Sequence, residues 1–424
     1  MLLATSGSGL NFSRPRLRDL GANGSLSPCG TPAPAADPTV ATDTNIAIVS
    51  CNAPGRTVLL DPNPAAPSQQ RYKAIGCFSN NGSADSGFPH GGKDLKVMYS
   101  SDGKSFSKAE TILSAHVPYL GAHDGLANIV WDSNMDGRKG GGYMIFLRTY
   151  HLAQDVKLQS RRLSRMVSKS AAFGGADAWE EPVEVASGES GYEIYELRPW
   201  RLEAWRPGLY YGVGMYYADA EPSGKVYCEL LTSPNWGRNW TRLAPHREFI
   251  PHGPAGSFDD HTCYAATPFA VDGSKELQYF FSGGNGPHNG VQTPGGVHVR
   301  DDAIALARGS ADAVAGLAHP DPAAWGSFVT EEVEVTHESL WVSLGATPGG
   351  AGQPQVNVEL RRRGAALAGF AGSAASCAGT PCRAEVSWPA QEGAALAALA
   401  GQRVEVAVSF RGCAVYSLGF GAGE

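Results

Sequence analysis

Long apolar segments and an excess of basic residues are both missing from this sequence. No run approaches the roughly 20 apolar residues that a membrane-spanning helix needs, and Met1 is not followed by the basic and apolar regions of a secretory signal. The 424 residues carry a formal net charge of −7, which argues against a nucleic acid or an anionic membrane as the main partner. A neutral or cationic ligand fits this charge better.

Several motifs that would identify other classes of protein are also missing. The sequence contains no Cys-x-x-Cys pair and no Cys/His spacing typical of zinc sites, so it predicts no structural zinc. It contains neither the Gly-x-Ser-x-Gly turn of esterases nor the His-Glu-x-x-His helix of metalloproteases. Nothing in it indicates a cofactor, and we expect none.

The eight cysteines leave two interpretations open. Most of them stand in or beside strand-like runs, where a free cysteine behaves as a small buried hydrophobic residue. Their even number is also compatible with disulfides, and Cys377 and Cys382 are then the leading pair. We favour a secreted or secretory-pathway protein, because four sequons would allow glycosylation there. The sequons begin at Asn11, Asn23, Asn81 and Asn239.

The sequence does contain a turn-rich β pattern, with 53 glycines, 28 prolines and 9% aromatic residues. Four times, a serine and a short loop of mostly small and polar residues lead to an aromatic residue, between two strand-like runs, as in a hairpin turn. Repetition of such a unit indicates a β-propeller, in which four-stranded antiparallel sheets repeat around a channel. The four copies span residues 6–12, 101–106, 168–173 and 233–240.

The order of these units predicts an all-β protein of two domains. Residues 1–325 would form a five-bladed β-propeller. Its first blade is incomplete at the N-terminus, because the first turn begins only five residues after Met1. From residue 326 to 424, short alternating strands continue at hairpin spacing without the repeat, which favours a β-sandwich.

Strings in both predicted domains resemble those of a known group of proteins. In the propeller they are residues 4–17, Asp61-Pro-Asn-Pro64 with Arg71-Tyr-Lys73, and Ser101-Asp-Gly103; in the sandwich they are residues 356–360, 367–370 and 400–406. These strings resemble glycoside hydrolase-like proteins with the invertase, arabinanase and sialidase superfolds, which have a five-bladed propeller followed by a sandwich. The resemblance implies a glycoside hydrolase that acts on a poly- or oligosaccharide. The alternative is a non-catalytic propeller that binds glycan or protein, inactive if the first blade is truncated.

Catalysis of this kind needs two carboxyl groups beside the scissile bond, one protonated and one ionised. The resemblance implies that they hang from the starts of the inner strands that line the funnel. Three successive predicted inner strands offer carboxylates there, and a turn or solvated role is the alternative for each. The candidates are Asp124, Glu193, Glu196, Asp259 and Asp260.

Glu193 and Glu196 are three residues apart in one predicted strand. A regular strand would place them on opposite faces, so only one of them could point into the funnel. Arg198 lies two residues beyond Glu196, shares its face and could hold it ionised. This leaves Glu193 as the freer candidate for the general acid.

Further polar residues are candidates for binding sugar hydroxyls. His123 and His261 flank the candidate aspartates, and Asn285 and His288 lie in a Gly-rich loop after a predicted strand, where no phosphate-binding pattern follows. Arg198 completes this set. The rings of Tyr195, Trp200 and Trp205 could stack on sugars, although packing in the core is the stronger expectation for each.

Residues 132–137 match the first half of a calcium-binding loop. The twelfth position is Tyr143 where the loop needs Glu, and a strand follows where a helix would be needed. We therefore favour a long hairpin turn and predict no metal site here.

Overall fold

The structure is a computed structural model of the whole chain. The predicted first blade and its turn, together with His123, Asp124, Trp205 and Cys377, lie outside the residues that it describes. The described residues are 56–79, 93–107, 109–114, 127–151, 160–202, 206–218, 224–271, 275–288, 290–292, 298–346, 354–374, 382–388 and 394–421.

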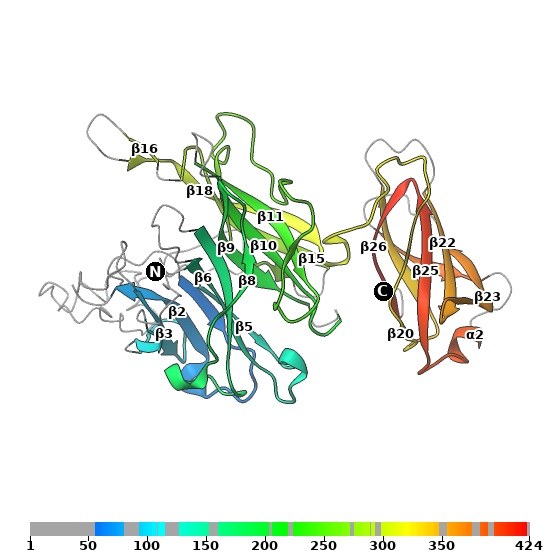
Figure 1. Cartoon of the computed structure of the whole chain (residues 1–424), viewed down its shortest axis with the longest axis horizontal. Helices are drawn as coiled ribbons and strands as arrows, with labels where there is room; N and C mark the ends of the chain where they lie inside the picture. The colour runs from blue at the N-terminus through cyan, green and yellow to red at the C-terminus, as the bar shows by residue number, and fades with distance from the viewer. Residues whose placement is uncertain are drawn as a thin grey trace, which may run out of the picture. The chain divides into compact units, whose positions relative to one another are not determined.

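The chain divides into two compact units (Figure 1). Unit 1 comprises residues 1–267 and 280–306, and unit 2 comprises residues 268–279 and 307–424. The sequence placed the domain boundary at residue 326, where the first strand of the unit 2 sandwich begins. Residues 307–325 join unit 2 because Asp312 pairs with Arg383 at 2.7 Å and Leu317 forms a β-bridge with Val415.

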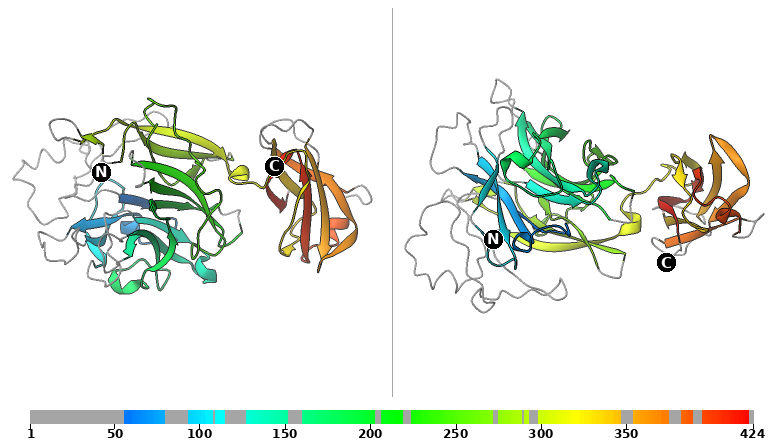
Figure 2. Two further views of the ribbon diagram at one scale, coloured as in Figure 1. Left: turned by 45° about the horizontal axis from the view of Figure 1, so that its top comes forward. Right: turned by 90° about the horizontal axis from the view of Figure 1, so that it is seen from below.

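In the described part of unit 1, the first two sheets are separate and four-stranded, each antiparallel with neighbouring strands in chain order (Figure 2). This up-and-down order is the arrangement of propeller blades. The first sheet contains β1 (Arg56–Leu60), β2 (Tyr72–Ser79), β3 (Lys93–Ser100) and β4 (Glu110–Leu113). The second contains β5 (Ala127–Asp132), β6 (Gly142–His151), β7 (Ser160–Val167) and β8 (Val183–Ser187).

The next sheet has eight strands, and its first half is another such group. That group is β9 (Tyr192–Trp200), β10 (Tyr210–Ala218), β11 (Lys225–Ser233) and β12 (Thr241–Arg242). The second group contains β13 (Thr262–Ala265), β14 (Phe269–Ala270), β15 (Glu276–Gly284) and β18 (Asp302–Ser310); in it β13, β14 and β18 each pair with β15. A single parallel pair, Val226 with Thr262, joins β11 to β13. The fold is therefore all-β and of the propeller type in unit 1.

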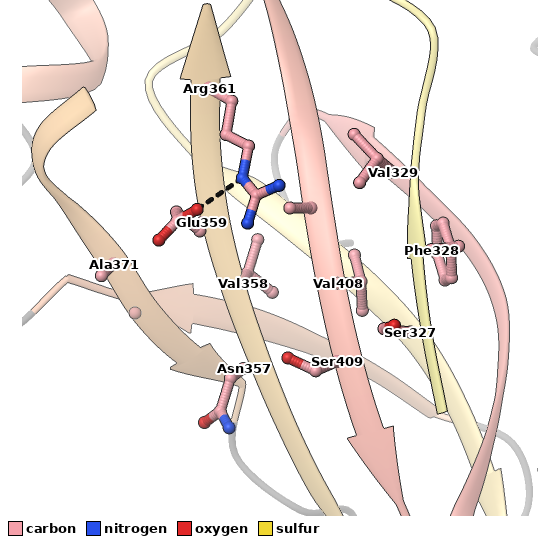
Figure 3. A pocket seen from close by; sticks show the side chains of 12 residues that line it. Ser327, Phe328, Val329, Asn357, Val358, Glu359, Arg361, Ala371, Val408 and Ser409 are labelled. Carbon is pink, nitrogen blue, oxygen red and sulfur yellow. Dashed lines mark hydrogen bonds and ion pairs between the residues drawn. The ribbon is translucent and has the colours of Figure 1, made fainter. Parts of the chain in front are cut away.

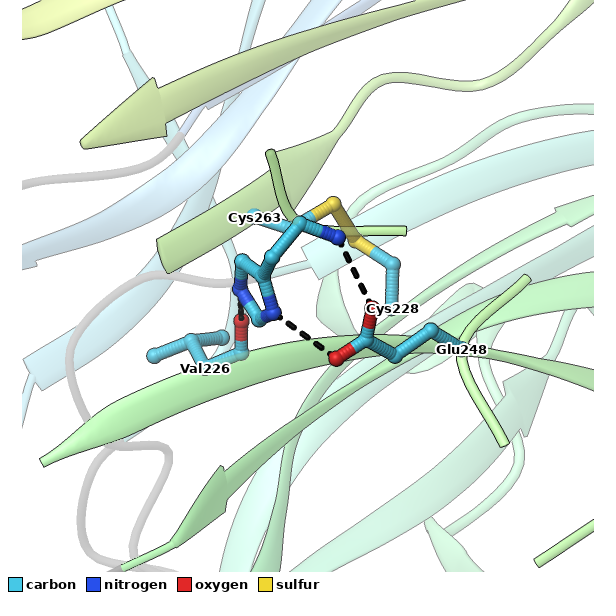
Figure 4. The surroundings of a disulfide bond; sticks show 5 residues. Val226, Cys228, Glu248 and Cys263 are labelled. Carbon is cyan, nitrogen blue, oxygen red and sulfur yellow. Dashed lines mark hydrogen bonds and ion pairs between the residues drawn. A yellow bond between two sulfur atoms is a disulfide. The ribbon is translucent and has the colours of Figure 1, made fainter. Parts of the chain in front are cut away.

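A disulfide joins the two groups of this sheet (Figure 4). Cys228 on β11 is bonded to Cys263 on β13, with their Cα atoms 5.8 Å apart. Of the two interpretations left open by the sequence, the disulfide therefore holds for this pair, which the sequence did not single out because the two runs are distant in sequence. Cys382 is also disulfide-bonded, whereas Cys413 is free and buried.

Three of the four predicted hairpin turns lie among the described residues. Each is a hairpin between two antiparallel strands, as predicted, and the structure places it between the third and fourth strands of a group: β3 to β4, β7 to β8 and β11 to β12. In the first turn the hydroxyl of Ser100, one residue earlier than expected, accepts hydrogen bonds from the amides of Asp102 and Gly103. The hydroxyl of Ser233 accepts one from the amide of Gly237. The aromatic residue of each turn packs inward, as Phe106, Phe173 and Trp240.

Buried polar networks connect the β1–β4 sheet to the β5–β8 sheet, and that sheet to the next, at the end of the first strand of each. Asp61, just after β1, accepts hydrogen bonds from Lys73 and from the hydroxyl of Tyr143 on β6 of the next sheet. Asp132 at the end of β5 likewise accepts one from Tyr210 on β10 at 2.5 Å. The side chains of Asp61 and Asp132 each also accept a bond from the amide two residues on, so the two sites repeat one design.

The segment that resembles half a calcium loop, residues 132–137, uses its aspartates in such networks. It forms the turn between β5 and β6, as favoured from the sequence. Asp132 pairs with Arg201 at 2.7 Å, and Asp136 pairs with Arg165 at 2.9 Å and Arg238 at 3.2 Å. Over the described part of the chain, no group of three or more His, Cys, Asp or Glu side chains could hold a metal ion.

Unit 2 is a β-sandwich whose strands alternate between core and solvent. In β25, for example, Val404, Val406, Val408 and Phe410 are buried and the residues between them are not. This alternation is the pattern that predicted the sandwich. Its strands are β19 (Gly326–Val329), β20 (Val333–Glu334), β21 (Leu340–Ala346), β22 (Gln355–Arg362), β23 (Ala365–Ala374), β24 (Cys382–Ser387), β25 (Arg403–Arg411) and β26 (Cys413–Phe420). A short helix, α2 (Ala394–Ala397), lies in the segment where the sequence allowed one.

Candidate functional site

The candidate site centres on a β-bulge in β9, the first strand of its group. In the register with β10, Ile194 pairs with Tyr216 and Glu196 pairs with Met215, so Tyr195 has no partner. Ile194 and Leu197 are both buried in one apolar cluster although they are three residues apart. An extra residue in a strand has this effect, because it shifts the alternation of side chains by one.

The bulge reverses the expected placement of Glu193 and Glu196. Each of them neighbours a core residue, Ile194 or Leu197, and therefore points to the other face of β9. The prediction that the two glutamates lie on opposite faces was wrong, because it assumed a regular strand. Both can face the same ligand.

Glu196 is buried where the first strands of three sheets meet. Its carboxylate pairs with Arg198 at 2.6 Å, as the spacing in the sequence predicted, and accepts a hydrogen bond from Asn128 on β5 at 3.1 Å. Asn128 also accepts a bond from Thr57 on β1 at 2.9 Å. Only 5% of the surface of Glu196 is exposed, so these partners hold its carboxylate in one position.

Glu193 is not free of cations, in contrast to the sequence prediction. It forms an ion pair with Arg161, whose strand β7 belongs to the preceding sheet. The guanidinium carbon of Arg161 also lies 5.7 Å from the ring centre of Tyr195 and 5.2 Å from that of Tyr217. This partner comes from another sheet, so strand alternation within β9 could not predict it.

Three tyrosines and a histidine form a wall beside Glu193; we call Tyr195, Tyr217, Tyr264 and His288 the tyrosine cluster. The imidazole of His288 lies 4.9 Å from the ring of Tyr195 and 5.4 Å from that of Tyr217, and its Nδ1 is hydrogen-bonded to the hydroxyl of Tyr264. Burial raises the pKa of Tyr264, so its hydroxyl is neutral at ordinary pH. The guanidinium of buried Arg148 lies 4.4 Å from the ring of Tyr195.

The structure thus brings together Glu193, Glu196, Arg198, His288 and Tyr195 of the predicted residues. Trp200, the other described candidate for sugar stacking, is 95% buried, in keeping with the expected packing role. The predicted loop position of His288 is held by Arg300, which donates a hydrogen bond to its backbone oxygen at 2.7 Å.

The two predicted aspartates before β13 build a turn. Asp259 accepts a hydrogen bond from the hydroxyl of Ser257 at 2.7 Å. Asp260 accepts one from the amide of Gly256 at 2.7 Å and contacts Nδ1 of His261 at 2.6 Å. The bond to His261, then that to Gly256, lowers the pKa of Asp260. No hydrogen bond or ion pair joins this turn to Glu193 or Glu196 among the described residues.

The side chain of Asn285 is bonded to Asp301 and not to the tyrosine cluster. Its side chain is exposed and accepts a hydrogen bond from the amide of Asp301 at 3.1 Å. Its amide nitrogen lies 3.4 Å from the Asp301 carboxylate. It therefore tethers two loop segments to each other.

Several residues of the site were not identified from the sequence. Most of them come from second and third strands or from neighbouring sheets, which a search of inner-strand starts passes over; Tyr264 lies on β13, and Arg300 lies just before β18. One signal was present: Arg148 is a charge within the apolar run of β6, and such a buried charge indicates a special environment. The missed residues are Thr57, Asn128, Arg148, Arg161, Tyr217, Tyr264 and Arg300.

Comparison with known proteins yields structural likeness only. No family model and no curated protein matches the sequence. Among solved structures, an N-acetylgalactosamine deacetylase from F. plautii, in complex with blood group B trisaccharide, is similar with a TM-score of 0.39 and 17% identity. The match covers 60% of this chain and 72% of that one. No helix in the described part of the chain is long and apolar enough to cross a membrane.

Two further similar structures act on arabinose-containing glycans by their names. A family 43 arabinoxylan arabinofuranohydrolase from Bacillus subtilis, in complex with cellotetraose, has a TM-score of 0.37 and 11% identity over 93% of this chain and 83% of that one. An α-L-arabinanase from Penicillium chrysogenum, in complex with arabinobiose, has a TM-score of 0.38 and 12% identity. That match covers 60% of this chain and 62% of the arabinanase, less than two thirds of its length.

Proposed function

We propose that unit 1 hydrolyses glycosidic bonds in an oligo- or polysaccharide, with Glu193 and Glu196 as the paired carboxylates. The observation that carries the proposal is the bulge at Tyr195, which turns both glutamates to one face of β9. Hydrolysis of this kind needs two carboxyl groups around one bond. Aromatic rings beside them, such as those of the tyrosine cluster, offer apolar surface to the C–H face of a sugar.

The two glutamates would have different roles. Glu196, buried between Arg198 and Asn128, is placed to act as the ionised base or nucleophile. Glu193 is the more exposed of the two, with 16% of its side chain exposed, and would act as the acid. The ion pair with Arg161 opposes a protonated Glu193, so the proposal requires the bound sugar to separate that pair.

The arginine on each glutamate also favours a second candidate, a propeller that binds a glycan without cleaving it. In such a pair the carboxylate accepts hydrogen bonds from sugar hydroxyls and the guanidinium donates hydrogen bonds to them, and neither requires proton transfer. In that case the tyrosine cluster and the two glutamates form a lectin-like surface. A carbohydrate partner is common to both candidates.

Hydrolysis assays on a panel of plant and algal polysaccharides and aryl glycosides test the choice. We expect Glu193→Gln and Glu196→Gln each to lower kcat/KM at least about 100-fold, the range of general acid–base catalysis. Glu184→Gln is the matched control, because Glu184 forms an ion pair with Arg162 on β7 but is half exposed. Its activity should be that of the wild type.

The two candidates predict different results in these assays. Binding of a glycan by the wild type without release of reducing sugar would establish the binding protein. Full hydrolysis by both glutamine variants would overturn the assignment and return attention to Asp124, Asp259 and Asp260.

A further inference from the structure

A groove crosses the outer face of one sheet in unit 2 (Figure 3). It has a volume of about 480 Å³ and spans the four neighbouring strands β19, β25, β22 and β23. Its floor is low because the outward residues there are small. Ala407 and Ser409 of β25 and Ala371 of β23 point away from the core that their neighbours Val406, Val408 and Phe370 fill.

A row of polar side chains runs across the groove. Ser327 on β19 pairs in register with Ser409 on β25, and Ser409 pairs with Asn357 on β22. Neighbouring strands are spaced about 4.8 Å apart, so the three side chains follow one another at that interval. Among the described residues none of the three makes a side-chain hydrogen bond, and Ser327 and Asn357 are exposed. They are available to a ligand.

The next row of outward residues is mainly apolar and carries no net charge. Val329, Ala407 and Ala371 provide methyl groups, and Val329 is 50% exposed. Glu359 in the same row pairs with Arg361 at 2.5 Å, so the charges in the groove cancel. A polar row therefore lies beside an apolar one.

This combination indicates the chemistry of the occupant. Sugars in a chain present hydroxyl groups at their edges and C–H groups on their faces, and the two rows match these surfaces. An anionic polymer would find no net positive charge. A protein partner would find no large exposed aromatic anchor, and the arginine of the lining, Arg361, is already paired with Glu359. Phe328, the aromatic residue of the lining, packs against the core.

We propose that this groove in unit 2 is a binding site for a segment of a neutral glycan chain. The proposal does not depend on hydrolysis by unit 1. Because the floor offers methyl groups and no exposed aromatic ring, we expect weak binding, with a Kd on the order of 1 mM for a single segment.

Affinity gel electrophoresis of the full chain measures such weak binding. The gels would contain dextran, xylan or galactomannan, with polygalacturonate as the acidic comparison, and the protein would carry Glu196→Gln to prevent cleavage. We expect at least one neutral polysaccharide to retard migration. Ala371→Trp, which fills the groove, should reduce the retardation, and Asn357→Ala should weaken binding by the groove about tenfold.

Ala365→Trp is the matched control, since Ala365 is an exposed alanine of the same strand that does not line the groove. It should migrate like the parent protein. Circular dichroism melts would show that all variants are folded. The proposal is overturned if no neutral polysaccharide retards the protein, or if Ala371→Trp is retarded as strongly as its parent.

Two readouts separate this proposal from that for unit 1. In a chain with intact Glu193 and Glu196, Ala371→Trp should leave the turnover of a small aryl glycoside unchanged. The Glu196→Gln parent should lose turnover and keep polysaccharide binding. Sedimentation equilibrium tests whether a second copy of the chain occupies the groove instead. If the parent is a dimer and Ala371→Trp dissociates it, the groove is a dimer interface and the glycan site is contradicted.

Discussion

Buried charged side chains join the sheets of unit 1, whereas aliphatic side chains fill the core of unit 2. In unit 1, Asp61 accepts a hydrogen bond from Tyr143 of the next sheet, and Asp132 pairs with Arg201 of the following one at 2.7 Å; both aspartates are at most 4% exposed. The core of unit 2 consists of alternating residues such as Val358, Leu360 and Val406. Both units are all-β, yet different kinds of side chain hold their sheets together.

The difference follows from how the sheets meet. A sandwich brings two broad apolar faces together, and alternation along each strand is enough to build them. In unit 1 the apolar clusters lie between one sheet and the next, and the first strands converge on a polar region. Directional bonds such as Asp61 to Tyr143 fix each sheet on its neighbour, so the side chains of the candidate site depend on them.

The largest effect on this comparison should come from Asp61→Ala. The substitution leaves Lys73, which is fully buried, without its carboxylate. Removal of one partner of a buried pair costs about 3–5 kcal/mol, so unfolding of unit 1 should move to much lower urea while that of unit 2 stays in place. Chemical denaturation followed by circular dichroism measures this.

Lys73→Met in the Asp61→Ala background is the control. It removes the unpaired buried charge of Lys73 and should restore part of the lost stability of unit 1. Glu184→Ala, which breaks an exposed pair, should cost at most about 1 kcal/mol. Equal effects of Asp61→Ala and Glu184→Ala would show that buried charges do not hold unit 1 together.

In unit 2 the corresponding test is Leu360→Ala. Leu360 is fully buried in the aliphatic core, and such a truncation costs about 3 kcal/mol through lost burial and the cavity that remains. The same urea experiment should show a shift of the unit 2 transition alone. Asn357→Ala, three residues earlier on the surface of β22, should leave it unchanged. If every variant shifted one common transition, the two units would unfold as one and the comparison would fail.

The smallest effect that we expect is a change in stability at low pH that depends on Asp136. Hydrogen bonds and charge from Arg238 and Arg165 outweigh the burial of Asp136, which by itself would raise its pKa, and the net pKa is lowered. A lowered folded-state pKa contributes stability that is fully present above the ordinary carboxyl pKa of about 3.9 and is lost as the pH falls through the lowered value.

We therefore expect Asp136→Asn to cost on the order of 1 kcal/mol at pH 7 and to differ less from the wild type at pH 2–3. Urea unfolding at a series of pH values measures the difference. A constant difference across the series would mean that Asp136 does not stabilise unit 1 through its charge.

Much of the architecture was accessible from local patterns. The alternation in segments such as residues 403–411 predicted the sandwich strands, and the Ser-to-aromatic turns at 101–106, 168–173 and 233–240 predicted three hairpins. Pairing of Arg198 with Glu196 was also predicted, because residues two apart in a regular stretch share a face. These features depend on neighbours in the sequence.

Local patterns therefore set the all-β class, the positions of the turns and the change from propeller-type repeat to sandwich. The contact of Cys228 with Cys263, the reach of Arg161 to Glu193 and the bulge at Tyr195 that turns Glu193 and Glu196 to one face arise from long-range packing. The physical reason is the range of the interactions. Side-chain alternation is set within one strand, whereas a bulge, a disulfide or an ion pair between sheets depends on which distant strands pack together.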